Sequence, residues 1–166
     1  MQDEATEWQR LAEKISRALY GPVRSQVRLP GGEIADIVVG DSSIRKDVRG
    51  GVRVVKRIIE CKVSALTSWD EVIEKYFKYC NMLEIWYLRA SHHSLKAPFP
   101  KTPSRVICKG PYELLSTLLG RGASGRRWVA DLESRKDLAK EMWNLKWEIA
   151  THSTDLIVCP RDLLIR

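Results

Sequence analysis

Two short apolar runs that each carry a charge, residues 34–39 (IADIVV) and residues 57–63 (RIIECKV), decide the fold. Both runs are rich in β-branched residues, which is typical of strands. Side chains two positions apart in a strand share a face, so Glu60 and Lys62 project together. Asp36 interrupts the earlier run in the same way. A charge in a half-buried strand costs free energy unless it is paired or binds a metal, so these three residues predict a site.

The segments around these runs predict the order helix, three strands, helix, strand. Apolar residues recur at helical spacing over residues 4–20 until a Gly-Pro pair, which predicts an amphipathic helix there. Residues 23–29 alternate apolar and polar side chains, so we expect a strand with Val23, Val27 and Leu29 on one face.

The second half of the chain continues the alternation of helices and strands. Apolar residues from Trp69 to Cys80 fall at i, i+3, i+4, i+7, i+8 and i+11, which predicts a helix followed by a strand at residues 83–88. Residues 91–104 contain three prolines and no apolar period, so a long loop is expected. Further elements are expected at residues 106–108 (strand), 112–119 (helix), 131–150 (helix) and 156–159 (strand). The length of 166 residues fits one domain.

The composition favours a polyanionic partner. Lys and Arg number 28 against 21 Asp and Glu, which gives a formal net charge of +7 and a pI near 9.4. The chain has no apolar run of about 18 residues and an acidic beginning, so we expect a cytoplasmic protein without membrane contact. Only three Gln and two Asn occur, a balance reported for proteins of thermophiles.

The cysteines lie far apart, without the paired spacing of a zinc ribbon or a redox motif. We therefore expect them to act as small buried hydrophobic residues. They are Cys61, Cys80, Cys108 and Cys159.

The two charged runs together resemble the D…(D/E)xK signature of the PD-(D/E)xK nuclease superfamily. Asp36 precedes Glu60 by 24 residues, Glu60 and Lys62 form the E-x-K element, and Ala35 stands where the signature has proline. The superfamily includes restriction endonucleases, archaeal Holliday junction resolvases and RecB-like nucleases. The resemblance implies a restriction endonuclease-like αβββαβ core over residues 4–90, with a central mixed sheet flanked by helices. Residues 91–166 would form a C-terminal α/β extension of the same domain.

The resemblance also implies a catalytic site. Asp36 and Glu60 would bind Mg²⁺ or Mn²⁺ through hard oxygen ligands. Lys62 would orient the attacking water or help to deprotonate it, and would offset charge developing on the phosphate. RecB-like members carry a Q-x-x-x-Y motif on the next helix, which Lys75 and Tyr79 match in part. Members often place a glutamate on the first helix, and Glu7 is the preferred candidate over Glu4 and Glu13. The cysteines do not match the iron–sulfur arrangement of some RecB-like nucleases, so no cluster is expected.

Basic residues around this site are expected to grip a nucleic-acid backbone, with affinity that falls steeply with salt and little sequence preference. They are Arg45, Lys46, Arg49, Arg53, Lys56, Arg57, Arg121, Arg126 and Arg127. A solvated surface is the alternative reading of the same residues. Glu33 is expected in a turn, on the face opposite Asp36, and His92 and His93 in solvent. Trp128 follows two arginines and is the one tryptophan for which base stacking is considered.

The sequence thus predicts a metal-dependent endonuclease of the junction-resolving or repair kind. By family analogy we expect DNA ahead of RNA as substrate, and a homodimer in an archaeon or its virus. One alternative is a protein of this fold that binds DNA or RNA and has lost cleavage. Another is a restriction-like or RNA-processing enzyme, which differs in substrate.

Overall fold

The protein is an α/β domain with one mixed, five-stranded sheet. The computed structural model describes residues 3–40, 44, 49, 51, 53–66, 68–90, 105–120 and 128–150. The strands lie in the order β1-β2-β3-β4-β5. Their bounds are Val23–Arg28 for β1, Ile34–Val39 for β2, Val55–Ser64 for β3, Cys80–Arg89 for β4 and Val106–Lys109 for β5.

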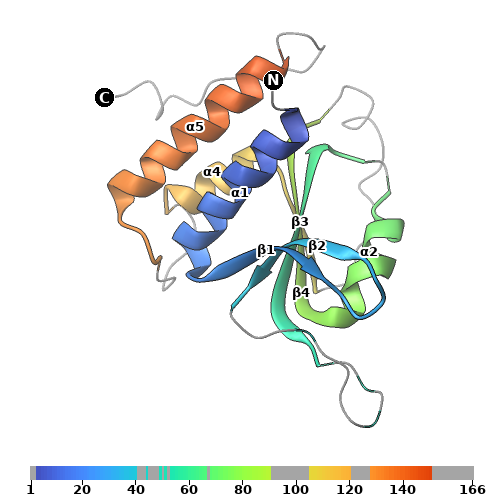
Figure 1. Ribbon diagram of the computed structural model, residues 1–166. Helices are drawn as coiled ribbons and strands as arrows, with labels where there is room; N and C mark the ends of the chain where they lie inside the picture. The colour runs from blue at the N-terminus through green and yellow to red at the C-terminus, as the bar shows by residue number, and fades with distance from the viewer. Residues whose placement is uncertain are drawn as a thin grey trace.

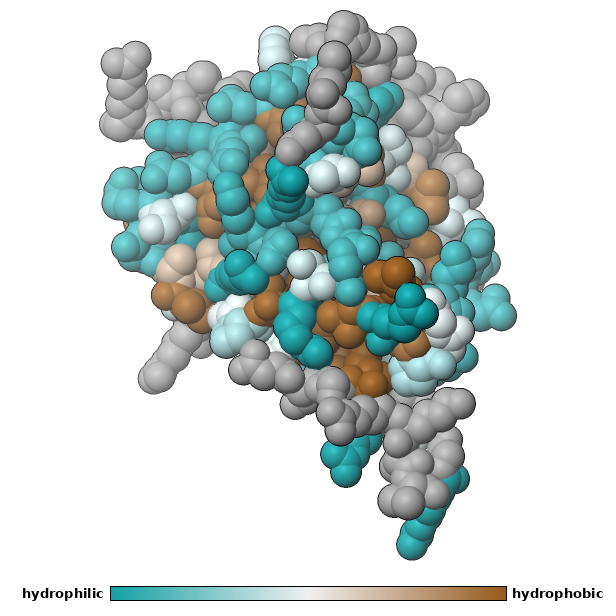
Figure 2. Space-filling model, in the orientation of Figure 1, coloured by the Kyte–Doolittle hydropathy of each residue, from teal (hydrophilic) through white to brown (hydrophobic). Residues whose placement is uncertain are grey.

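Helices cover both faces of the sheet. Helices α1, α4 and α5 lie on one face and α2 lies on the other, as Figure 1 shows. The bounds are Glu4–Tyr20 for α1, Asp70–Tyr76 for α2, Phe77–Tyr79 for the 3₁₀ turn η1, Pro111–Leu118 for α4 and Leu132–Ala150 for α5. Hydrophilic residues dominate the outer surface over α1 and α5 (Figure 2). Among the residues described above, no helix is both long and apolar enough to cross a membrane.

Local signals in the sequence explain where α1 begins and ends. The Asp3 carboxylate accepts a hydrogen bond from the Thr6 amide at 2.8 Å, as an N-cap residue does. Gly21 ends the helix with a φ of 90°, a conformation that glycine adopts at little cost. On the buried side, the indole of Trp8 donates to the Trp86 carbonyl at 3.3 Å, which ties α1 to the centre of the sheet.

The sheet changes from antiparallel to parallel at β3. Strands β1, β2 and β3 form an antiparallel meander, whereas β3, β4 and β5 run parallel. Parallel neighbours need a crossover, and α2 supplies the one between β3 and β4. In the register, Ile37 lies opposite Ile59, Glu60 opposite Ile85 and Lys62 opposite Tyr87.

Two hydrophobic cores fill the space on either side of the sheet. The core under α1, α4 and α5 includes Trp8, Trp86 and Met142. The core under α2 includes Trp69 and Ile85. The described cysteines are free thiols, with Cys80 buried and Cys61 and Cys108 half-buried, as small hydrophobic residues would be.

Strand β1 does not keep one apolar face, which corrects the expected alternation. Val23 packs in the core under α1, whereas Val27 and Leu29 pack in the core under α2. The switch coincides with Gln26, whose φ is 53°, outside the extended range of a strand. Strand β2 switches at the facing position, because Ile37 packs under α1 and Ala35 under α2. The tip of the β1–β2 hairpin therefore turns towards α2 (Figure 1).

Most of the expected elements are present within the described ranges. The helix over residues 4–20 and the strand over residues 34–39 have the predicted bounds. The helix expected to reach Cys80 ends at Tyr76, because β4 begins at Cys80 and a 3₁₀ turn joins the two. The expected loop over residues 91–104 and strand over residues 156–159 lie outside the described residues.

Candidate functional site

Asp36 and Glu60 interlock at the point where β2 and β3 separate. The ladder between these strands runs up to the pair of Ile37 and Ile59, so Asp36 and Glu60 occupy the next facing positions. There, the Asp36 amide donates to Glu60 Oε1 at 2.9 Å. The Cys61 amide donates to Asp36 Oδ2, also at 2.9 Å. The carboxylates thus occupy acceptor positions between the strands, and each holds the other strand's backbone.

Lys62 shares this face of the sheet. Its side chain is two positions from Glu60 in β3, so both project towards the side of α2. The ammonium is near enough for its charge to lower the pKa of Glu60. Within the described ranges, Lys62 forms no ion pair with a carboxylate at 4.0 Å or less. The three side chains predicted as catalytic therefore meet on one face of two neighbouring strands.

The site is short of positive charge. Glu60 is 3% exposed, and burial followed by the charge of Asp36 raises its pKa to about 8. The opposing effect of Lys62 is smaller than these two. Burial, with the charges of Asp36 and Glu60, also raises the pKa of the Cys61 thiol. A cation placed beside the two carboxylates would relieve this imbalance.

Tyr76 of α2 closes the site from above the sheet, and the sequence did not identify it. Its hydroxyl donates to the Ile34 carbonyl at 3.2 Å. Burial, then the charges of Glu60 and Asp36, raise the pKa of this phenol, so the hydroxyl keeps its proton at neutral pH. Tyr76 belongs to the apolar stripe of the helix. The neighbouring sequence does not distinguish a tyrosine that only packs in the core from one that also borders a functional site.

Glu33 lies on the same side of the sheet as the Asp36 and Glu60 carboxylates, contrary to expectation. Its charge acts on the Tyr76 hydroxyl together with those of Glu60 and Asp36. The expected opposite face assumed a regular strand from Glu33 to Asp36. Strand β2 begins only at Ile34, and its side chains change face near Asp36, so counting residues misplaces Glu33.

The donor set of Asp36 and Glu60 fits a hard divalent cation. Mg²⁺ is commonly held by one or two carboxylates and keeps several waters, and both side chains here offer carboxylate oxygens. Glu60 Oε1 and Asp36 Oδ2 each accept one backbone hydrogen bond, which fixes both groups. In the described ranges, no three or more His, Cys, Asp or Glu side chains are grouped as metal ligands. Any further ligands would come from water or substrate.

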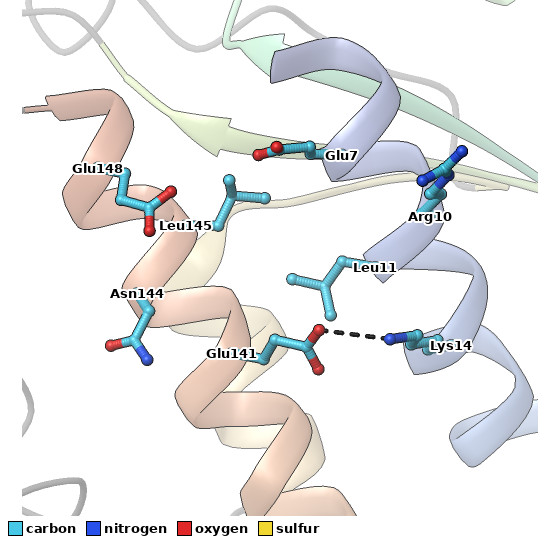
Figure 3. A pocket seen from close by; sticks show the side chains of 8 residues that line it. All are labelled: Glu7, Arg10, Leu11, Lys14, Glu141, Asn144, Leu145 and Glu148. Atoms are coloured by element: carbon cyan, nitrogen blue, oxygen red, sulfur yellow. Dashed lines mark hydrogen bonds and ion pairs between the residues drawn. The ribbon is translucent and has the colours of Figure 1, made fainter. Parts of the chain in front are cut away.

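Glu7 is not part of this constellation. It lines a groove of about 300 Å³ between α1 and α5, where it lies across from Leu145 (Figure 3). Lys14 and Glu141 bridge the same groove at 3.4 Å. Helix α1 covers the face opposite Lys62 and Glu60, so the expectation that Glu7 assists catalysis is not supported by its position.

Lys75 and Tyr79 do not form a single helical motif. Lys75 is exposed in the last turn of α2 and pairs with Glu71 at 3.5 Å. Tyr79 follows in η1 and is 3% exposed. Its hydroxyl lies against Gly31, where a Cβ atom would come within 2.7 Å of it. Tyr79 therefore packs the hairpin tip onto the α2 side.

Among the expected phosphate-binding residues, Arg57 has a different environment. Its side chain is 16% exposed and forms an ion pair with Glu84 beneath α1. This placement argues against a role in gripping a backbone. Arg49, Arg53 and Lys56 are exposed, as such a role requires. The remaining members, with both loop histidines, lie outside the described residues: Arg45, Lys46, Arg121, Arg126, Arg127, His92 and His93.

Trp128 has a structural role that removes it from consideration for base stacking. Its indole donates to the Thr117 carbonyl at 3.1 Å. The guanidinium of Arg135 covers its ring, 4.2 Å from the centroid. The tryptophan therefore joins the end of α4 to the start of α5.

Glu84 forms a second buried cluster of charges, on the other face of the sheet. Its carboxylate pairs with Arg57 and, at 2.7 Å, with Lys109. The Tyr20 hydroxyl donates to it at 2.7 Å and the Trp86 indole at 3.3 Å. Burial by itself would raise the pKa of Glu84, but the charges of Lys109 and Arg57 outweigh burial and lower it.

Comparisons of the chain with protein-family models, with curated proteins and with solved structures find no match. The functional assignment therefore depends on the residues of this chain and their geometry.

Proposed function

We propose that this protein is a metal-dependent nuclease of the PD-(D/E)xK type that hydrolyses DNA phosphodiester bonds. One observation carries the proposal: Asp36 and Glu60 interlock beside Lys62, and burial, followed by the charge of Asp36, raises the pKa of Glu60. The αβββαβ order of the first half of the chain, with a central mixed sheet, supports a restriction endonuclease-like core.

Each residue has a chemical task in this proposal. Mg²⁺ or Mn²⁺, when bound, supplies charge stabilisation and a more acidic water. Asp36 and Glu60 would hold it, and Glu60 would first have to release its own proton, which its raised pKa opposes below about pH 8. Lys62 directs an ammonium to the phosphate and its attacking water. The attacking water would bond to phosphorus and release one proton to solvent, one P–O ester bond would break, and the leaving oxygen would take up a proton.

The proposal also includes DNA ahead of RNA as substrate and a homodimer. The net charge of +7 supports a polyanionic partner. Arg53 and Lys56 are exposed at the beginning of β3, the strand that carries Glu60 and Lys62. Resolution of a DNA junction requires cuts in two strands, which the two sites of a homodimer would supply.

A second candidate is a protein of the same fold that binds DNA or RNA without cleaving it. The position of Glu7 favours it, because the first helix adds no carboxylate to Asp36 and Glu60. A site reduced to two acidic side chains would bind a cation more weakly than one with three.

Metal-dependent nicking of supercoiled plasmid tests the proposal. We expect nicking with Mg²⁺ or Mn²⁺, none with EDTA, and a loss of at least about 100-fold in Asp36→Asn and Lys62→Ala. Asp36→Asn is preferred over alanine because its amide oxygen still accepts from the Cys61 amide. Gel-shift binding should persist in both variants.

Three outcomes separate the candidates. Nicking that depends on Asp36 and Lys62 supports the nuclease. DNA binding without nicking under any metal supports the binding protein. Nicking that both variants retain rejects the site. Junction, flap, single-stranded and RNA substrates, compared at equal salt, then identify the substrate class.

A further inference from the structure

Gln26 of β1 has a backbone conformation that no other non-glycine residue in the described ranges shares. Its φ is 53°, in the left-handed region that costs free energy for a residue with a Cβ atom. Such strain persists only where the surroundings over-determine it, and it clusters at functional sites. Gln26 is exposed, so core packing does not impose the conformation.

The strained residue lies directly opposite Asp36. The register pairs Ser25 with Ile37 and Val27 with Ala35, which leaves Gln26 facing Asp36 without a ladder pairing. At this position both strands exchange the face on which their side chains pack. The interruption of the sheet is therefore centred on the pair of Gln26 and Asp36.

The side chain of Gln26 is directed at the carboxylate. Its Nε2 donates to Asp36 Oδ1 at 3.5 Å, while the Cys61 amide donates to Oδ2 of the same group at 2.9 Å. The carboxylate is thus held at both oxygens, one from each neighbouring strand. If only the backbone conformation mattered, glycine would be favoured at this position, because it adopts a positive φ without strain. Glycine has no side-chain carboxamide, so the presence of glutamine indicates a role for that group.

We propose that Gln26 is a positioning residue of the cation site, whose carboxamide fixes the rotation of the Asp36 carboxylate. This inference rests on the proposed function, which supplies the bound cation. The contact by which Gln26 orients Asp36 does not itself require a cation. Groups that orient a metal ligand typically contribute about 10- to 100-fold in metal affinity.

Two substitutions separate the amide from the backbone strain. Gln26→Met keeps the side-chain length and the strain but loses the amide, whereas Gln26→Gly loses both. Ser25→Gly is the matched control, because Ser25 is also exposed in β1 and has no contact with Asp36 among the hydrogen bonds of the described residues. We expect Mn²⁺ affinity, measured by calorimetry, to fall about 10-fold in both Gln26 variants and to stay unchanged in Ser25→Gly.

A metal-free measurement tests the same residue independently. The Cys61 amide reports the position of Asp36, so its hydrogen exchange should be about 10-fold faster in Gln26→Met and unchanged in Ser25→Gly. The melting temperature should fall by about 4 °C in Ser25→Gly, because glycine weakens a strand, but not in Gln26→Gly, where it relieves strain.

The outcomes distinguish this inference from the proposed function. If Gln26→Met leaves both Cys61 exchange and Mn²⁺ affinity unchanged, the role of Gln26 is rejected, and Mn²⁺ binding that Asp36→Asn abolishes still supports the nuclease. If Cys61 exchange accelerates in Gln26→Met but the unmodified protein binds no Mn²⁺, Gln26 positions Asp36 and the metal-dependent function is rejected.

Discussion

Glu60 and Glu84 are buried carboxylates on neighbouring strands of one sheet, yet their environments are opposite. In the register, Glu84 lies beside Ile59, the residue before Glu60, so the two glutamates project to different faces. Glu84 meets two cations and two hydrogen-bond donors, and its pKa is lowered. Glu60 meets another carboxylate, and its pKa is raised to about 8.

The difference between Glu84 and Glu60 suggests a criterion that separates a buried charge with a structural role from one with a proposed functional role. Both groups are almost fully buried, so burial does not distinguish them. Compensation does, because a buried charge that the protein leaves uncompensated costs free energy that folding alone gives no reason to retain. Glu84 on the face under α1 is compensated by Lys109 and Arg57, whereas for Glu60 on the face under α2 the proposed nuclease function would supply the missing positive charge as a bound cation.

Removing the compensated carboxylate should have the largest effect. In Glu84→Ala, Arg57 and Lys109 lose their shared partner in a buried position, so the free energy of unfolding should fall by about 3–5 kcal/mol. Urea denaturation measures it. The control is Glu141→Ala, whose ion pair with Lys14 is more than half exposed on both sides and should contribute less than about 1 kcal/mol. Equal effects of the two variants would contradict the distinction between these charges.

Removing the ammonium of Lys62, which lies near Glu60, should affect the proposed chemistry more than cation binding. In Lys62→Met, nicking should fall about 100-fold, because the charge on the phosphate is no longer offset. Mn²⁺ affinity should stay the same or rise, because a like charge has left the cation's surroundings. Nicking rates and calorimetry measure the two effects. A parallel loss of affinity and rate would show that Lys62 acts through the metal site.

The two glutamates should give stability opposite dependences on pH. The raised pKa of Glu60 means that the folded state binds more protons, so stability falls as pH rises from about 4.5 to about 8, by at most about 1.4 kcal/mol per unit. The lowered pKa of Glu84 stabilises the fold above its ordinary value of 4.5, and that contribution is lost as pH falls below it.

The substitution Glu60→Gln isolates the loss of stability with rising pH that comes from ionisation of Glu60. The glutamine oxygen still accepts from the Asp36 amide but carries no charge, so the variant should unfold less readily than the unmodified protein at pH 8 and equally at pH 4.5. Denaturation at several pH values, without metal, measures this. A variant that is less stable at pH 8 would mean that Glu60 is already compensated.

The smallest expected effect compares two tyrosines. Tyr20 donates to the charged Glu84, so Tyr20→Phe should lower the free energy of unfolding by about 1.5–3 kcal/mol. Tyr76 donates to the neutral Ile34 carbonyl, so Tyr76→Phe should lower it by about 0.5–1.5 kcal/mol. Thermal denaturation of both variants measures the difference, and the reverse ranking would contradict the contrast between the two faces.

The sequence predicted what depends on local pattern. Helix α1 and strand β2 follow from apolar spacing and a Gly-Pro stop, and the shared face of Glu60 and Lys62 follows from strand geometry. The convergence of these residues with Asp36 was predicted from the cost of charges in half-buried strands and from a resemblance, since spacing alone does not pair β2 with β3.

The rest depends on contacts between distant parts of the chain. Arg57 was grouped with surface cations because its neighbours in the sequence do not indicate that it pairs with Glu84, 27 residues away. The face switch in β1 depends on one torsion angle at Gln26, and it also misplaced Glu33. Glu7 was assigned to the site because members of the superfamily often place a glutamate on the first helix. In the structure it lines the groove between α1 and α5, away from Asp36 and Glu60.

The hydrogen bonds between β2 and β3 also limit which substitutions the fold tolerates during evolution. Where a ladder would continue, side-chain oxygens of Asp36 and Glu60 receive the backbone amides. A mutation to an apolar residue at either position would leave a peptide N–H without an acceptor, so selection on the fold alone opposes it. If the proposed cleavage were lost during evolution, we would therefore expect asparagine or glutamine at these two positions, because their side-chain oxygens still accept the backbone hydrogen bonds.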